Sequence, residues 1–123
     1  MTIKQATDTF DSRYPCSYTY EDKVRWLSGL DMRIARELLI PFGIFDKDFS
    51  GYEASASPDT PLLVPHPFDE MYILYLIMQT DLFNGETQRY NNDILAFMSV
   101  YNDFCAYVSR NGKQKSRSVH VSM

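Results

Sequence analysis

The chain has 123 residues, of which 45% are hydrophobic and 23% charged, and its formal net charge is −4 at pH 7. These values fit one domain with a sizeable core, and they exclude a disordered chain and a collagen-like fibre. All sixteen acidic residues lie at or before Asp103, so this part of the chain is acidic. Its charge argues against a nucleic-acid-binding protein with a broad basic face.

Aromatic residues are unusually frequent at 15%, with nine Tyr, eight Phe and one Trp. A core of this size does not need so many large rings, and Tyr in particular is enriched at protein interfaces. The excess therefore favours a protein that contacts other proteins.

The cysteines and the apolar segments bear on the compartment. Cys16 and Cys105 are far apart in sequence, and residues 1–10 are polar and mixed, unlike a signal peptide. We therefore expect a reduced cytosolic protein with two free thiols. The longest nearly uncharged apolar stretch, 71–79, is too short to span a bilayer, so we expect a soluble protein with no membrane contact.

The first part of the chain predicts two helices. Residues 3–11 lack Gly and Pro and repeat apolar side chains at helical spacing, and Pro15 lies beyond the end of that helix. Thr19 is a suitable N-cap for a second helix, which Pro41 stops. The apolar stripe of this second helix comprises Val24, Leu27, Leu30 (or Asp31), Ile34 and Leu38.

Residues 42–67 form a long irregular connection. It carries four prolines within ten positions, after a Ser/Ala-rich run at 50–57. A loop of this length is uncommon in a compact domain and is often functional or docked on a neighbour. Its aromatic residues indicate that it packs against something, and residues 62–64 predict a short extended segment that covers the core.

The rest of the chain predicts two more helices and a tail. Pro67 suits the first helical position, or the one before it, of a helix at 68–83 that is apolar on nearly every face, which is typical of a central helix. Asn84–Gly85 ends it, and a last helix at 86–110 stops at Asn111–Gly112. We predict an all-α domain over 1–112: about three main helices, a short N-terminal helix and a long loop.

Residues 113–123 form a basic, extended C-terminal tail with three cations and no acid. Its alternating pattern is suited to ordering on a partner, whereas the simpler interpretation is a solvated terminus. The candidate partner-binding residues are Lys113, Lys115, Arg117, Val119, His120 and Val121.

The sequence contains no recognisable catalytic motif. His66 and His120 have no metal-ligand spacing to each other or to the cysteines. There is no Gly-rich phosphate loop, nucleophile elbow or paired-cysteine motif. We therefore predict no enzymatic activity and no cofactor.

Two acidic residues, Asp31 and Asp81, fall on or beside apolar stripes. We predict buried structural carboxylates, satisfied by an arginine or by helix N-terminal amides. The available arginines are Arg33, Arg36 and Arg89. A weaker alternative is that the two carboxylates face one another and share a proton or hold a metal, as in a hydrolase or metal protein.

Other side chains are candidates for contacts between subunits. The segment 85–92 is equally well interpreted as a polar helix start or as a contact surface rich in Arg, Tyr and Asn. Rings before the second helix and in the long loop exceed what one core needs. The candidate interface residues are Tyr14, Tyr18, Phe45, Phe49, Tyr52, Arg89 and Tyr90.

Four segments together resemble a family of small tailed-bacteriophage neck proteins, the head–tail connector or head-completion adaptors. These segments are DSRYP at 11–15, EDKVRWLSGLD at 21–31, LLVPHPFDEMYILY at 62–75 and QTDLFNGETQRYNN at 79–92. Residues 42–57 depart from the family pattern, so the resemblance implies no role for that loop.

The resemblance implies a helical subunit of the virion neck, made in the cytoplasm of the host bacterium. Such subunits form a ring, twelve-fold in the family, between the portal protein and the downstream neck, stopper or tail proteins. Duplex DNA passes through the lumen without sequence-specific binding, and the C-terminal tail docks into a neighbouring protein. The alternative is a small monomeric phage-encoded binding or inhibitory module, without enzymatic activity, that uses the loop as its contact.

Overall fold

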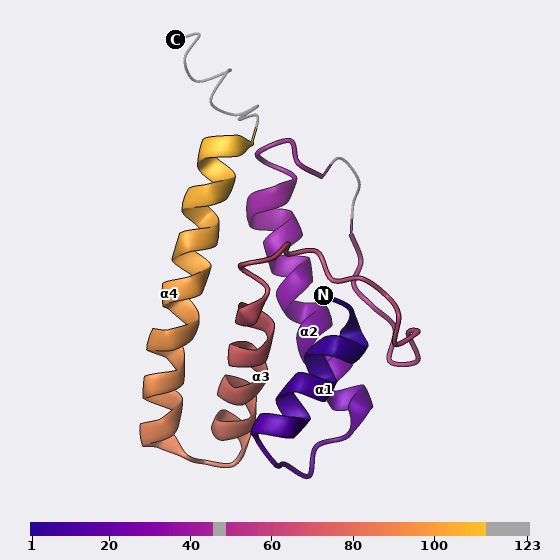
Figure 1. Cartoon of the computed structure of the whole chain (residues 1–123), viewed down its shortest axis with the longest axis vertical. Coiled ribbons are helices and arrows are strands. Elements are labelled where there is room, and N and C mark those ends of the chain that lie inside the picture. The colour runs from indigo at the N-terminus through magenta and orange to yellow at the C-terminus, as the bar shows by residue number, and fades with distance from the viewer. Residues whose placement is uncertain (46–48, 113–123) are drawn as a thin grey trace, which may run out of the picture.

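The computed structural model describes residues 1–45 and 49–112 (Figure 1). Its elements are α1 (Ile3–Arg13), α2 (Tyr20–Ile34), the π-helical turn η1 (Ala35–Leu39), α3 (Glu70–Phe83) and α4 (Thr87–Asn111). The described residues contain no strand, and the only bridge among them joins Thr2 to Pro61. The predicted all-α fold is confirmed.

The first two helices begin at capping boxes. The Thr19 hydroxyl accepts from the Asp22 amide, and the Asp22 carboxylate accepts from the Thr19 amide, which confirms the predicted N-cap. Thr2 and Gln5 make the same reciprocal pair at the start of α1. Two of the amides that each helix start leaves unbonded are thereby satisfied.

The C-terminal end of α2 passes directly into η1. Here the Ile40 amide donates to the Ala35 carbonyl at 2.9 Å, so the last turn is wider than an α-helical turn. The helical stretch ends before Pro41 as predicted. The sequence carries no signal for the change of helix type within it.

Helix α3 occupies the centre of the bundle and contacts α1, α2 and α4. Four of its side chains, Met71, Tyr72, Ile73 and Leu76, are completely buried, which confirms the prediction of an enclosed helix. The helix starts later than predicted, because residues 66–69 form turns, with the Phe68 amide donating to the Pro65 carbonyl. Pro67 is therefore not the first helical residue.

Helix α4 lies along one edge of the molecule (Figure 1). It follows α3 after a tight turn in which Gly85 has a φ of +74°, a conformation that favours glycine. Among the other helices described, α4 contacts only α3 and η1. One long side of this 25-residue helix therefore has no helical neighbour.

The irregular connection crosses the molecule beside the N-terminus, above the start of α3 (Figure 1). The Ile3 amide donates to Thr60 O at 3.0 Å, and the Leu62 amide donates to Met1 O at 2.9 Å. Leu62 and Val64 are buried, so the segment expected to cover the core does so. The candidate tail residues at 113–123 lie outside the described residues.

Candidate functional site

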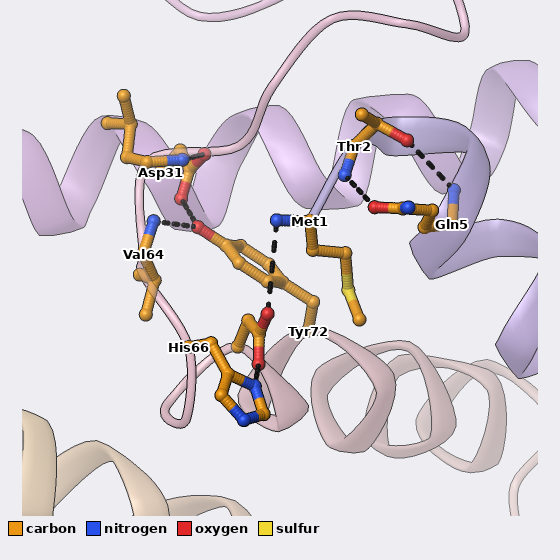
Figure 2. A network of polar contacts seen from close by, with 9 residues as sticks. Met1, Thr2, Gln5, Asp31, Val64, His66 and Tyr72 are labelled. Carbon is orange, nitrogen blue, oxygen red and sulfur yellow. Dashed lines mark hydrogen bonds and ion pairs between the residues drawn. The ribbon is translucent and has the colours of Figure 1, made fainter.

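The first of two carboxyl sites is built around Asp31 of α2, which is completely buried. Its carboxylate accepts hydrogen bonds from the Tyr72 hydroxyl at 2.6 Å and the Tyr52 hydroxyl at 2.5 Å. A third bond comes from the Leu63 amide at 3.1 Å (Figure 2). The prediction that an arginine pairs with Asp31 is therefore wrong, because two neutral hydroxyls and one amide satisfy this carboxylate.

The Asp31 site fastens the long loop to two helices. The Tyr72 hydroxyl of α3 also accepts from the Val64 amide at 2.8 Å, so Tyr72 connects Asp31 to the loop from the other side (Figure 2). Burial raises the pKa of Asp31, although its three donors act against that rise. Burial and the neighbouring carboxylate raise the pKa of Tyr72 far above its usual value. Tyr52 and Tyr72 therefore stay protonated and donate to Asp31. The loop residues Leu63 and Val64 are held in place by their bonds to Asp31 and Tyr72.

Near the Asp31 site, Met1 takes part in a second cluster of polar contacts (Figure 2). The Met1 ammonium lies 3.8 Å from the Asp69 carboxylate, whose other oxygen lies 3.2 Å from His66 Nδ1 (Figure 2). This cluster ties the N-terminus to the turns before α3. Asp69 is therefore engaged with the distant Met1 and the nearby His66, and it makes no side-chain capping bond to α3.

The second carboxyl site lies where the end of α1, α3 and the start of α4 meet. Asp81 of α3 is buried and accepts a hydrogen bond from the Tyr14 hydroxyl. Arg89 Nη1 approaches that hydroxyl at 3.4 Å. The site opens into a hollow of about 390 Å³ whose polar lining includes Arg13, Tyr14, Asp81, Arg89, Asn92 and Asp93.

Asp93 of α4 completes this second site, and the sequence reasoning did not single it out. It lines the same hollow as Asp81, and its Oδ2 is buried without a hydrogen-bond partner. Loss of solvent and the proximity of Asp81 raise the pKa of Asp93 to about 7. The one feature of the sequence that could have indicated Asp93 is its position beside Ile94, at the edge of the apolar stripe of α4.

Asp31 and Asp81 have no partner in common. The carboxyl pair in this molecule is Asp81 with Asp93, and not Asp81 with Asp31. Across residues 1–45 and 49–112, no group of three or more His, Cys, Asp or Glu side chains is placed to hold a metal ion. In the same residues no helix is long and apolar enough to cross a bilayer, and Cys16 and Cys105 are free thiols.

The aromatic interface candidates all make contacts within the chain. Tyr18 donates to Asn84 Oδ1 at 2.9 Å, and its ring packs edge-on against Trp26. Phe49 packs edge-on against both Phe45 and Tyr52. These rings join the loop and the α1–α2 connection to the core. Contact between them and a neighbouring subunit stays a prediction.

Tyr90 lies with other rings in a groove of about 320 Å³ between α2, α3 and α4. Its aromatic lining consists of Tyr75, Tyr90, Phe97 and Tyr101, and Met98 and Arg33 also line it. Met98 is 39% exposed, so the groove is continuous with the outer side of α4.

The outer side of α4 between Asn91 and Ser109 carries fewer charged residues than the exposed sides of α1 and α2. Asp103 is the only charged residue among the eleven exposed residues between Asn91 and Ser109. By contrast, four of the six exposed residues of α1 are charged, as are five of the six on α2 and η1. We call this side the α4 face; its uncharged members are Asn91, Asn92, Leu95, Ala96, Met98, Ser99, Asn102, Ala106, Tyr107 and Ser109.

Leu95 is the most exposed large apolar side chain of the described residues, at 71%. Apart from Met98, its neighbours on the α4 face are small or carry amides, so another surface is able to approach the helix closely.

No family model matches the chain, and no curated protein or solved structure is significantly similar to it.

Proposed function

We propose that this protein is a structural assembly subunit: a head–tail connector adaptor of a tailed bacteriophage. In this proposal its copies form a ring between the portal protein and the downstream neck or tail proteins. The phage assignment rests on the resemblance of the four sequence segments. The role in assembly is supported by one observation, the charge-poor α4 face.

The composition of the α4 face is that of an interface rather than of a free surface. The cores of protein interfaces are depleted of charged residues, whereas a solvated helix of this length normally alternates charges of both signs. Leu95, Met98 and Tyr107 provide apolar area, and the small residues between them allow close packing. A ring needs two different patches on each subunit, and the α4 face supplies one of them.

The alternative, a monomeric inhibitory module that uses the loop as its contact, has less support. The rings Phe49 and Tyr52 and the buried Leu62 and Val64 are engaged with the chain itself. A loop held in this way offers fewer of its apolar side chains to a target.

A substitution at the centre of the α4 face tests the proposal. Ser99→Glu places a charge in the face, and Ser12→Glu on the exposed side of α1 is the matched control. We expect both variants to fold, and only Ser99→Glu to lose assembly with the portal protein in a sedimentation experiment. Equal assembly of the two variants would remove the α4 face from the proposal.

A further inference from the structure

The Asp81–Asp93 site has an unusual arrangement, because two carboxyls meet at a helix–helix contact. Asp81 belongs to the central helix α3, and Asp93 belongs to the second turn of the edge helix α4. Two ionised carboxylates in contact repel each other, so such a pair normally retains one proton between them. Here Asp93 Oδ2 is buried and has no other donor, so a shared proton supplies the bond that it lacks.

The other groups that face the pair lie at the rim of the hollow. Arg13 is the last residue of α1 and Tyr14 follows it, and Arg89 and Asn92 come from α4. Tyr14 already donates a hydrogen bond to Asp81. Arg89 is exposed, and its charge also interacts with that of Glu86. The arginines therefore do not neutralise the pair from inside, but they offer a partner at the rim to a carboxylate that turns outward.

We propose that Asp81 and Asp93 form a proton-dependent clasp: a shared proton holds the first turns of α4 on α3, and its loss toward neutral pH releases them. In the released state the Asp93 carboxylate points to the arginines and to water. The clasp controls the position of the helix that carries the α4 face. It is an intramolecular property and is independent of the proposed function.

The direction of the pH effect follows from linkage. The closed state binds the proton more tightly than an open state in which Asp93 is solvated, because its pKa is raised in the closed state. The closed state is therefore most favoured below about pH 4, where a free Asp is protonated as well. It loses stability as the pH rises, until the clasp itself is deprotonated.

Two measurements on the full chain test the clasp. Carboxyl ¹³C NMR should show a titration midpoint near 7 in the Asp81–Asp93 pair. Hydrogen exchange of the amides at 87–93, corrected for intrinsic exchange, should accelerate by up to about tenfold per pH unit between pH 5 and 7. Ordinary midpoints for both carboxyls would overturn the proposal, even without any variant.

Asp93→Asn tests the mechanism of release. The asparagine amide donates to Asp81 at every pH, so exchange at 87–93 should stay slow and lose its pH dependence. Asp103→Asn, which removes an exposed carboxylate from the same helix, should behave like the wild type. The proposal is overturned if Asp93→Asn keeps the wild-type pH dependence, or if Asp103→Asn abolishes it.

Discussion

Tyrosine hydroxyls are the side-chain donors to Asp31 and Asp81, two of the buried carboxylates of this protein. Tyr52 and Tyr72 donate to Asp31, and Tyr14 donates to Asp81. A neutral donor adds no second charge to desolvate, and each ring also buries apolar area against the core. Part of the tyrosine excess therefore has a use inside the fold, in addition to any contact with a partner.

Removing each hydroxyl from the Asp31 site should have unequal effects. Tyr72→Phe takes a donor from Asp31 and an acceptor from the Val64 amide, so we expect the free energy of unfolding to fall by about 3 kcal/mol. Tyr52→Phe removes one donor at a partly exposed site, and we expect a loss of about 1–2 kcal/mol. Urea denaturation at pH 7 measures both; equal losses would contradict the second role given to Tyr72.

At the residue scale, the sequence was sufficient to predict that Asp31 and Asp81 are buried, but it did not indicate which groups bond to them. Asp31 and Asp81 were recognisable because helical periodicity places them on apolar stripes. Their donors come from the loop, from another helix and from the residue after α1, and local sequence does not encode such long-range pairing. The same reason explains why Asp93 and the occupied Asp69 carboxylate were missed.

At the scale of elements, the helices follow from local rules and the loop does not. Caps and apolar periodicity suffice for α1, for the continuous helical stretch of α2 and η1, and for α4, whose outer ends differ from prediction by two residues or fewer. The start of α3 differs because the turns at 66–69 are fixed by contacts with the distant N-terminus. The course of the loop depends on its bonds to Met1, Ile3 and Asp31.

Two glycines associated with α2 should respond in opposite ways to the same substitution. Gly29 is exposed inside the helix with open space at its Cβ position, so Gly29→Ala should stabilise the protein by about 0.5–1 kcal/mol. Gly51 in the loop has a φ of +92°, and a Cβ there would overlap Ser28 Oγ, which accepts from the Tyr52 amide. We expect Gly51→Ala to cost at least about 1–2 kcal/mol.

Thermal unfolding of both variants decides this comparison. A higher Tm for Gly29→Ala and a lower Tm for Gly51→Ala are the predicted results. If Gly51→Ala is neutral, the loop is not held against α2 at this position.

For the whole molecule, the main feature is the uneven distribution of charge over its sides. Charged residues dominate the exposed positions of α1 and α2, whereas the α4 face carries Asp103 alone. The first side is suited to solvent, and the second to another protein. Sequence reasoning placed the interface candidates in the loop, in the rings before α2 and in the segment 85–92, which includes the start of α4. The rest of the uncharged side of α4 becomes apparent only when burial separates the two sides of the helix.

The tail provides a separate test of assembly. Removing residues 113–123 should leave the helical content and the Tm unchanged, because the buried core residues that hold the helices together lie between Ile3 and Val108. In the proposed function the same deletion abolishes binding to the head or portal assembly. Circular dichroism and particle assembly measure the two effects; normal particles formed with the shortened chain would refute a docking role for the tail.

The central claim is that this protein assembles on a neighbouring protein as one of several copies. Native mass spectrometry of the full chain, alone and mixed with the portal protein of the same virus, tests it most directly. The account predicts a complex that contains many copies of this chain on each portal, with Ser99→Glu remaining monomeric in the same mixture. A wild-type chain that stays monomeric in the presence of the portal would contradict it.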